Sequence, residues 1–492
     1  MITLDNNTPI VNALYKVKCD KVTKFDIPIH RSGRWDKEML SYYAENVLFN
    51  DSNSMRPLDN LIDPISVIKE SEDITAKAFE ASNAFCIVNG TTAAVQAMIM
   101  YACKAGEKII LPRNIHKSVI NALILSGAIP IYVNPGTDKC FGLSLGMSVD
   151  DIETTVKNNP DAKAIFINNP TCYGICSNLK RIVEIAHEND MLVLVDEAYG
   201  AHFYFSDDLP DAAMHIGADL AAVGMHKTGG SLTQSSFLLC GNKIDSQYLR
   251  GIINLTQTTS ASYLLLVSLE LARKNMLKNG KELLRKVIEA TEFARCEINK
   301  IGGYFAYGKD LINGNGVFDF DVSKLSVFTH AIGLSGIEVL EILLDKYNIQ
   351  LECGDTCNIL ALLSTNICDL ATPEKDGDVQ ELLSALKDIK KLHSKPTADA
   401  YEYVYIEPNV AIAPQKAFYS SKLTTKIDLS VGEVCGELLM SYPPGIPILA
   451  PGELITREIV DYFNYSKKNG CEFVGSDGIR SSLIKVVRND IK

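Results

Sequence analysis

The fold is decided by the stretch Met191-Leu-Val-Leu-Val-Asp196-Glu-Ala-Tyr-Gly200-Ala-His202. Its apolar run leads directly into an acid, a pattern that predicts a fully buried parallel strand with Asp196 at its carboxyl end. A second apolar run, Leu220-Ala-Ala-Val223, is followed in the same way by His226 and Lys227. Because ligands of open α/β sheets bind beyond the carboxyl ends of the strands, we expect Asp196 and Lys227 to face one pocket.

Two interpretations of this pair are open. Pyridoxal phosphate (PLP) requires a lysine amine that bonds to its aldehyde and an acid beside its pyridinium nitrogen, which Lys227 and Asp196 would supply. A buried structural ion pair would place the same two residue types at neighbouring strand ends. The pair alone does not separate these interpretations, so the rest of the chain has to decide.

The composition is that of a globular protein of two or three domains. The 492 residues are 47% apolar and 22% charged, and the net charge of −12 disfavours non-specific binding to nucleic acid. The sequence has no apolar run of ~18 residues and no basic, apolar leader, so neither a membrane span nor a signal peptide is expected. Thirteen cysteines without a Cys-x-x-Cys pair favour reduced thiols in the cytoplasm and no zinc site.

Short apolar runs alternate with helical patterns through the first two thirds of the chain. Strands are predicted at residues 84–88, 108–112, 129–133, 163–167, 191–195, 220–223 and 235–240. The last strand follows Lys227 after a turn too short for a parallel crossover, so it should be antiparallel. The pattern predicts a doubly wound, mostly parallel sheet of about seven strands with helices on both faces.

The first of these strands runs into Asn89-Gly90-Thr91-Thr92 and then into a helix. Backbone N–H groups at the start of the helix and two hydroxyls would form a cradle for a phosphate. Plain N-capping by threonine is the commoner use of such a turn. Two adjacent threonines after a glycine favour the phosphate interpretation.

A histidine follows the next strand at the same predicted edge of the sheet. His116 lies just beyond residues 108–112, in the turn Arg113-Asn-Ile-His-Lys-Ser118. A lone histidine is more often structural than catalytic. If the strands are parallel, however, His116 shares the edge with Thr91, Asp196 and Lys227.

The pattern divides the chain into four parts. They are an N-terminal arm at 1–70, a large domain at 71–305, a small α/β domain at 306–405 and a C-terminal domain at 406–492. Outside the main sheet, helices are predicted at 8–15, 65–81, 258–275, 281–301, 336–344, 374–394 and 456–465, and strands at 317–322 and 349–351.

The motifs in this order resemble the ornithine/lysine/arginine decarboxylase family, PLP-dependent enzymes of the aspartate-aminotransferase-like fold, fold type I. The length resembles the short form of the family. The motifs that carry the resemblance are Val88-Asn-Gly-Thr-Thr92, Arg113-Asn-Ile-His-Lys-Ser118, Asn169-Pro-Thr171, Asp196-Glu-Ala-Tyr-Gly-Ala-His202, His226-Lys-Thr-Gly-Gly-Ser-Leu-Thr-Gln234, Tyr442-Pro-Pro-Gly-Ile-Pro447 and Pro451-Gly-Glu453.

The resemblance implies a role for each site residue. Lys227 would carry PLP, and Asp196 would pair with its pyridine nitrogen. Ala198 and His116 would contact opposite faces of the ring, and Tyr199 would lie near the cofactor edge. The phosphate would be held by Gly90, Thr91 and Thr92, with His226 nearby. Lys227, His116 and Asp196 would be the catalytic residues.

The activity implied is PLP-dependent decarboxylation of arginine, lysine or ornithine to the corresponding amine and CO2, in polyamine biosynthesis. The resemblance also implies a cytoplasmic homodimer or higher homo-oligomer with an amino-acid substrate and no nucleic-acid or membrane partner. A carboxylate would have to pair with the basic side chain of the substrate, and Glu437 and Glu453 are candidates. The sequence does not determine which basic amino acid is used.

Two positions depart from the family pattern. Gly224 stands where relatives usually have a serine that contacts the phosphate, and Pro28-Ile-His30-Arg31 replaces the usual Pro-Gly-His-Lys. Two alternatives therefore stay open. One is another PLP reaction on the same fold, such as transamination or aldol cleavage, and the other is a non-catalytic relative that acts as a binding partner.

Overall fold

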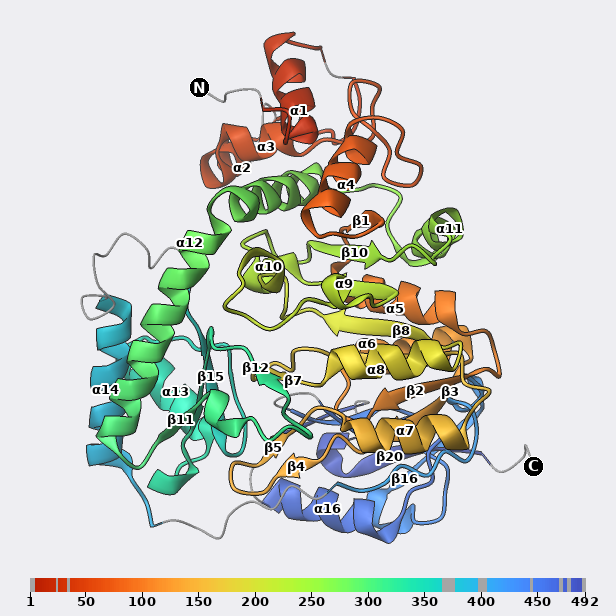
Figure 1. Cartoon of the computed structure of the whole chain (residues 1–492), viewed down its shortest axis with the longest axis vertical. Coiled ribbons are helices and arrows are strands. Elements are labelled where there is room, and N and C mark those ends of the chain that lie inside the picture. The colour runs from red at the N-terminus through yellow and green to blue at the C-terminus, as the bar shows by residue number, and fades with distance from the viewer. Residues whose placement is uncertain are drawn as a thin grey trace. The chain divides into compact units, whose positions relative to one another are not determined.

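The main feature of the computed structural model is a seven-stranded sheet in the order β1-β10-β9-β8-β6-β2-β3 (Figure 1). Its strands are β1 (Asn83–Ile87), β2 (Lys108–Pro112), β3 (Ile129–Val133), β6 (Ala164–Asn168), β8 (Leu192–Glu197), β9 (Leu220–Val223) and β10 (Ser236–Cys240). β10 is antiparallel to both β1 and β9, whereas β2 is parallel to β3 and β6, and β8 to β9. The predicted fold class and the antiparallel last strand are confirmed.

The structure describes residues 5–23, 25–32, 36–364, 377–396, 405–442, 446–468, 472–475 and 479–488. The chain divides into two compact units. Unit 1 comprises Met1–Tyr101, Leu194–Asp207 and Asp211–Lys281, and unit 2 comprises Ala102–Val193, Asp208–Pro210 and Glu282–Lys492. The predicted division into four parts stays a prediction.

The helices fall into the two units as follows. Unit 1 holds α1 (Pro9–Cys19), α2 (Lys37–Tyr43), α3 (Glu45–Asn50), α4 (Val67–Ala78), α9 (Ala213–Ile216), α10 (Met225–Thr228), α11 (Ser246–Thr256) and nearly all of α5 (Gly90–Ala102). Unit 2 holds α6 (Lys117–Ser126), α7 (Val149–Asn158), α8 (Leu179–Glu188), α13 (Gly336–Tyr347), α14 (Gly377–His393), α15 (Pro414–Tyr419) and α16 (Arg457–Lys468). Among the described residues, no helix has the length and apolar content that a membrane crossing requires.

One long helix, α12 (Tyr263–Ile301), replaces the two helices predicted at 258–275 and 281–301 (Figure 1). The prediction of two helices was wrong, because the chain stays helical between the two predicted segments and through Gly280. A glycine inside a helix costs only about 1 kcal/mol relative to alanine. A Cβ at Gly280 would lie 3.0 Å from the Cβ of Phe205, so the glycine permits a close approach within unit 1.

The core of unit 1 contains a cluster of aromatic rings around Phe79, which is fully buried just after α4. The ring of Phe79 lies 4.8, 5.2 and 5.6 Å from the rings of Tyr204, Phe205 and Phe237, all in edge-on or steeply inclined arrangements. Edge-to-face aromatic pairs stabilise a core beyond the apolar area they bury. The cluster thereby connects α4 with β10 and with the segment that follows β8.

Unit 2 contains a second sheet in the order β11-β13-β15-β14. Its strands are β11 (Phe305–Tyr307), β13 (Lys324–Phe328), β14 (Cys353–Gly354) and β15 (Asn358–Leu362). They share a buried core with α13 and α14. The predicted helix at 336–344 is confirmed as α13, which begins with a capping box between Ser335 and Glu338.

Two strand predictions in this region were wrong. Residues 349–351 form no strand, and β14 begins only at Cys353. The run 317–322 contains only β12 (Asp319–Phe320), which pairs with β7 (Ile175–Cys176) and not with the second sheet. Short apolar runs carry little information about their strand partner, because pairing depends on contacts distant in sequence.

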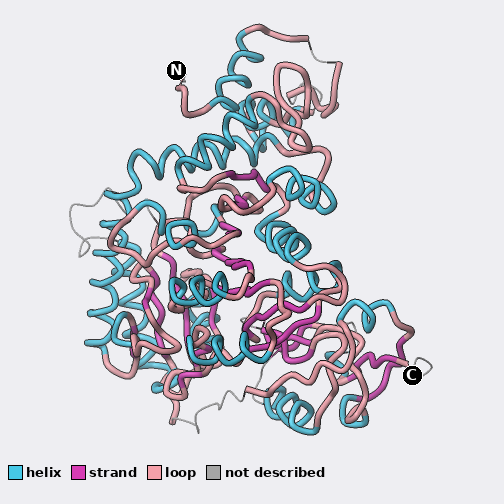
Figure 2. The backbone as a smooth tube through the Cα atoms, turned by 45° about the vertical axis from the view of Figure 1, so that its right-hand side comes forward, coloured by secondary structure: helices cyan, strands magenta, loops and turns pink. Residues whose placement is uncertain are grey.

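The C-terminal part of unit 2 forms two small sheets of short strands (Figure 2), which surround their own buried core. β16 (Lys422–Lys426) pairs with β20 (Leu483–Val487), and β17 (Leu439–Tyr442) pairs with β18 (Ile446–Leu449) and β19 (Glu472–Val474). Two further short strands of unit 2, β4 (Thr137–Asp138) and β5 (Leu143–Ser144), pair with each other. Residues 443–445 of the proline-rich motif lie outside the described residues, as do 374–376 at the start of the predicted helix 374–394.

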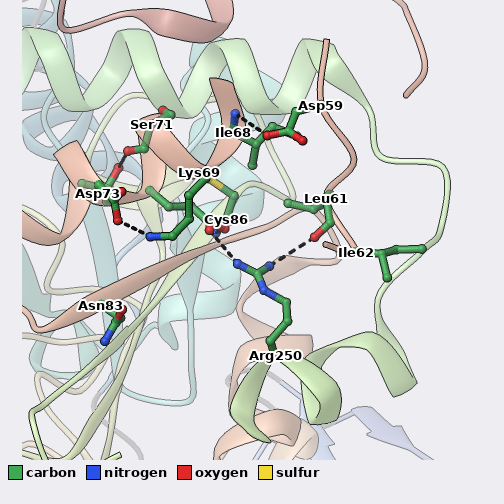
Figure 3. A network of polar contacts seen from close by, with 12 residues as sticks. Asp59, Leu61, Ile62, Ile68, Lys69, Ser71, Asp73, Asn83, Cys86 and Arg250 are labelled. Atoms are coloured by element: carbon green, nitrogen blue, oxygen red, sulfur yellow. Dashed lines mark hydrogen bonds and ion pairs between the residues drawn. The ribbon is translucent and has the colours of Figure 1, made fainter. Parts of the chain in front are cut away.

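A buried ion pair in unit 1 holds α11 to α4 and β1 (Figure 3). Arg250 donates to Oε2 of Glu72 at 2.6 Å and to the carbonyl of Leu61 at 3.2 Å, while Oε1 of Glu72 accepts the backbone N–H of Cys86 at 3.0 Å. Burial raises the pKa of Glu72, and the charge of Arg250 opposes that rise. Arg250 therefore offsets part of the cost of burying the Glu72 carboxylate.

We expect Arg250→Met to lower the free energy of unfolding by about 3–5 kcal/mol at neutral pH, because it leaves the Glu72 carboxylate buried and uncompensated. The pKa of Glu72 then rises further. When the pKa of a carboxyl is higher in the folded than in the unfolded state, the group stabilises the fold at pH values below its unfolded pKa, near 4.5. This stabilisation is lost as the pH rises through the pKa of the folded state. The deficit, measured by denaturant unfolding, should therefore grow as the pH is raised above 4.5.

Lys69→Ala is the matched control, because Lys69 and Asp73 form an exposed ion pair in the same network (Figure 3). Exposed pairs contribute about 0–1 kcal/mol, so this variant should unfold close to the wild type. Equal losses in the two variants would contradict the assignment of the stability to Arg250 and Glu72.

Candidate active site

The carboxyl ends of β8 and β9 lie side by side in unit 1. In their parallel register Asp196 is opposite Ala222, and Glu197 is opposite Val223. Lys227 follows four residues after Val223, within the single turn of α10. The two predicted residues, Asp196 and Lys227, thus extend from neighbouring strand ends, and both are half-buried.

Tyr199 and Ala198 contact these two residues. The Nζ atom of Lys227 lies 3.5 Å from the ring centroid of Tyr199, a cation–π contact. Oδ1 of Asp196 accepts the backbone N–H of Ala198 at 3.1 Å. The amine is therefore held against an aromatic face, and the carboxylate is oriented by its own strand end.

The close packing of the two strand ends explains the glycine at position 224. A Cβ on Gly224 would lie 2.3 Å from the backbone oxygen of Ala198. No real Cβ makes so short a contact with backbone, so a serine here would require the main chain to move. The departure from the family pattern is thus accommodated by close approach of the segments that follow β8 and β9.

The Gly90-Thr91-Thr92 turn forms the start of α5, next to the first residue of β10. Gly90 has a left-handed φ of +76°, and no atom lies within 4 Å of the position of a Cβ there. Its N–H donates to the carbonyl of Gln234 at 2.8 Å. The hydroxyl of Thr91 is hydrogen-bonded to that of Ser236 at 2.8 Å. The turn therefore offers open space in front of a helix start, where anions bind favourably.

Ser236 is a further candidate for the site that the sequence analysis missed. It is fully buried and lies opposite Ile87 in the antiparallel pairing of β10 with β1. The prediction that β10 is antiparallel contained the signal, because that direction places the first residue of β10 beside the residues that follow β1.

The segment between Lys227 and β10 is a closed turn. Nδ1 of His226 lies 3.1 Å from the carbonyl of Ser235, and the hydroxyl of Ser235 is 2.5 Å from both the hydroxyl of Ser231 and the carbonyl of Leu232. A carbonyl only accepts, so Nδ1 of His226 carries the proton in this hydrogen bond. Nε2 of a neutral His226 is then an acceptor.

Beside Asp196, Glu197 is fully buried and points away from solvent. Oε2 accepts the hydroxyl of Tyr204 at 2.6 Å, and Oε1 accepts the backbone N–H of Ala213 at 2.8 Å. Burial raises the pKa of Glu197 to about 8. The hydrogen bonds from Tyr204 and Ala213 oppose this rise in the pKa.

His116 belongs to unit 2, unlike the other predicted site residues. It is the N-cap of α6, where Nδ1 accepts the backbone N–H of Ser118 at 3.2 Å, and its side chain is exposed. Since Nδ1 accepts, the proton of the neutral ring lies on Nε2. The residues that share unit 1 are Gly90, Thr91, Thr92, Asp196, Ala198, Tyr199, His226 and Lys227.

Two family models match the chain. The model of the Orn/Lys/Arg decarboxylase major domain covers residues 8–369, and that of the Orn/Lys/Arg decarboxylase C-terminal domain covers 396–478. The arginine decarboxylase of Halalkalibacterium halodurans is 37% identical over 486 residues, and that of Bacillus subtilis is 35% identical over 488 residues. Each alignment covers 98% of both chains.

Solved structures of lysine decarboxylases have a similar fold. The constitutive lysine decarboxylase of E. coli has a TM-score of 0.82 at 18% identity, with 98% of this chain and 82% of that chain covered. The Francisella novicida lysine decarboxylase has a TM-score of 0.81 at 19% identity, with 98% and 81% covered. The fold is that of the fold-type I PLP enzymes, as the sequence predicts. The chain therefore belongs to the ornithine/lysine/arginine decarboxylase family and is an amino-acid decarboxylase.

Proposed function

We propose that this protein is a PLP-dependent arginine decarboxylase that converts arginine to the corresponding amine and CO2. Curated relatives named arginine decarboxylase, at 35–37% identity over nearly the whole chain, support arginine over lysine or ornithine. The observation that carries the proposal is the parallel register of β8 and β9, which places Asp196 and Lys227 at neighbouring strand ends.

The residues of unit 1 fit PLP. Lys227 would bond to the aldehyde, Asp196 would accept a hydrogen bond from the protonated pyridine nitrogen, and Ala198 would contact one face of the ring. The open space at Gly90 and the hydroxyl of Thr91 suit the phosphate, with Thr92 and His226 beside it. His116 would contact the other ring face, and Tyr199 its edge. When bound, the cofactor supplies an electron sink for the negative charge that remains on Cα as CO2 leaves.

The side chains of this chain would act on protons and charge. The Asp196 carboxylate, which accepts the Ala198 N–H, would keep a proton on the ring nitrogen and so stabilise negative charge that develops nearby. The amine of Lys227 would deliver a proton to Cα after CO2 has left. The face of Tyr199 stabilises that amine in its charged form, ready to give the proton.

We also propose that the protein self-associates in the cytoplasm, as a homodimer or a higher homo-oligomer. Large apolar side chains of the N-terminal segment are exposed in the single chain, with Phe25 85% and Ile29 78% accessible. Exposed apolar surface of this kind is typical of protein–protein contact sites. Sedimentation of the purified protein would measure the oligomer.

We expect Lys227→Ala to abolish the visible absorbance band of bound PLP and to lower kcat/KM for arginine by roughly 10³-fold or more, because the amine that holds the cofactor and moves the proton is lost. Lys243→Ala, which removes an exposed lysine of the same unit, is the control and should keep both signals. Absorbance spectra and CO2 release measure the outcome.

Product analysis separates the alternatives. Amine and CO2 in equal amounts support decarboxylation, whereas a keto acid would indicate transamination. Wild-type protein that neither binds PLP nor releases CO2 from arginine, lysine or ornithine would contradict the proposal and favour a non-catalytic relative. Equal kcat/KM for arginine and lysine would contradict only the choice of substrate.

Gly224→Ser introduces the residue that is usual in the family. We expect this variant to unfold with a free energy lower by about 1–3 kcal/mol and to bind PLP more weakly, because the new Cβ overlaps the Ala198 oxygen. Thermal unfolding and PLP titration test this. Gly251→Ser is the control, since no atom lies within 4 Å of a Cβ there. Tighter PLP binding in Gly224→Ser would show that the strand ends adjust freely.

A further inference from the structure

We infer that Glu453 of the Pro451-Gly-Glu453 motif is a positioning residue that acts through Arg113 on the loop carrying His116. The inference rests on the proposed function in one respect, namely that His116 contacts the cofactor. All of the residues involved belong to unit 2, and their contacts lie within this one compact unit.

The link is a bidentate ion pair between residues 340 positions apart. Nη1 of Arg113 donates to Oε1 of Glu453 at 2.6 Å, and Nη2 donates to Oε2 at 2.9 Å. The side chains are only 5% and 2% exposed. Paired, parallel hydrogen bonds of this kind fix orientation as well as distance, and only arginine can form them with a carboxylate.

The surroundings hold both partners in place. The Glu453 carboxylate also accepts the N–H of Ala450 at 2.9 Å, and Nη2 of Arg113 also donates to the carbonyl of Ile448 at 2.9 Å. The guanidinium lies 4.8 Å from the ring centroid of Tyr132, the residue opposite Leu111 on β3. The C-terminal strand β18 and the end of β2 are thereby joined by charge, hydrogen bonds and ring contact.

The loop between this ion pair and α6 has little freedom left. Arg113 directly follows the last residue of β2, and His116 caps α6 three residues later. Between them, the carbonyl of Asn114 accepts Nδ2 of Asn168 at 2.7 Å, and Ile115 is 1% exposed. Loss of the Glu453 contact would release the first anchor of this loop and let the His116 ring change its tilt.

The same geometry argues against Glu453 as the partner of the substrate side chain. Both of its oxygens are engaged by protein donors, two of them on one guanidinium. A substrate guanidinium would have to displace Arg113 from a buried site and leave that charge uncompensated. A positioning role predicts a loss of kcat, whereas a substrate-binding role predicts a rise in KM for arginine.

The test uses full-length protein and the variants Glu453→Gln and Arg113→Lys. The first readout is hydrogen exchange of the peptide spanning 113–118 in cofactor-free protein, which we expect to become faster in both variants. The second is the visible circular dichroism band of PLP-loaded protein, whose intensity reports the tilt of the ring. We expect that band to change, and kcat to fall by about 10- to 100-fold with KM within about threefold.

Two controls separate positioning from general destabilisation. Lys108→Met removes an ion pair with Asp161 at the other end of β2 and should leave all three readouts unchanged. Arg250→Lys weakens the buried pair with Glu72 in unit 1 and should lower the Tm without changing exchange at 113–118. Glu453→Asp, which keeps the charge, should retain part of the wild-type band, and it replaces Glu453→Gln if that variant does not fold.

The outcomes are distinguishable. A lower Tm with unchanged exchange and an unchanged band would reduce Glu453 to a purely structural residue and overturn the inference. A selective rise in KM for arginine, with kcat retained, would overturn it in favour of substrate binding. Faster exchange in a protein that binds no PLP would support the link from Glu453 to the loop while the proposed function itself fails.

Discussion

The parallel register of β8 and β9 is the constraint on which the candidate site depends. It places Asp196 opposite Ala222, so that an acid ends one strand while the next strand continues through Gly224 into the turn that carries Lys227. A slip of one residue would turn Asp196 to the other face of the sheet, because side chains alternate along a strand. In this register Leu194 and Val195 of β8 and their partners Leu220 and Ala221 of β9 are all fully buried. The chemistry thus depends on the core of the sheet as much as on the polar residues at its edge.

The main sheet could be predicted because its strands are short, apolar and separated by clear turns. Buried parallel strands are apolar on both faces, which makes them conspicuous in a sequence such as Leu220-Ala-Ala-Val223. The antiparallel direction of β10 followed from the length of its connection alone. Prediction failed at α12, which continues through the gap left between the two predicted helices, where Gly280 lies close to Phe205. It failed again at 349–351, where an apolar run forms no strand.

The candidate site shows the same limit more sharply. Residues that lie in motifs, such as Asp196, Lys227 and Thr91, could be named from the sequence because each follows a strand. Ser236 and the pairing of Arg113 with Glu453 could not be named, because the partners are separated by 145 and 340 positions and neither side of the pair is unusual by itself. From the sequence, Glu453 was therefore only one of two candidates, with Glu437, for pairing with the substrate side chain. Only the geometry assigns it to a guanidinium of the same chain.

Gly224 and Ser236 together suggest how a family site can change one ligand and keep its shape. The missing side chain at 224 lets the backbone after β9 lie against the Ala198 oxygen, which brings the strand ends that bear Asp196 and Lys227 close together. The hydroxyl lost at 224 is not replaced nearby on β9, but β10 begins with Ser236, whose hydroxyl already bonds to Thr91 at the start of α5. A phosphate needs hydrogen-bond donors around it, but these donors can come from different positions in the chain. A donor on the neighbouring antiparallel strand can therefore support Thr91, while the glycine improves the packing of the edge.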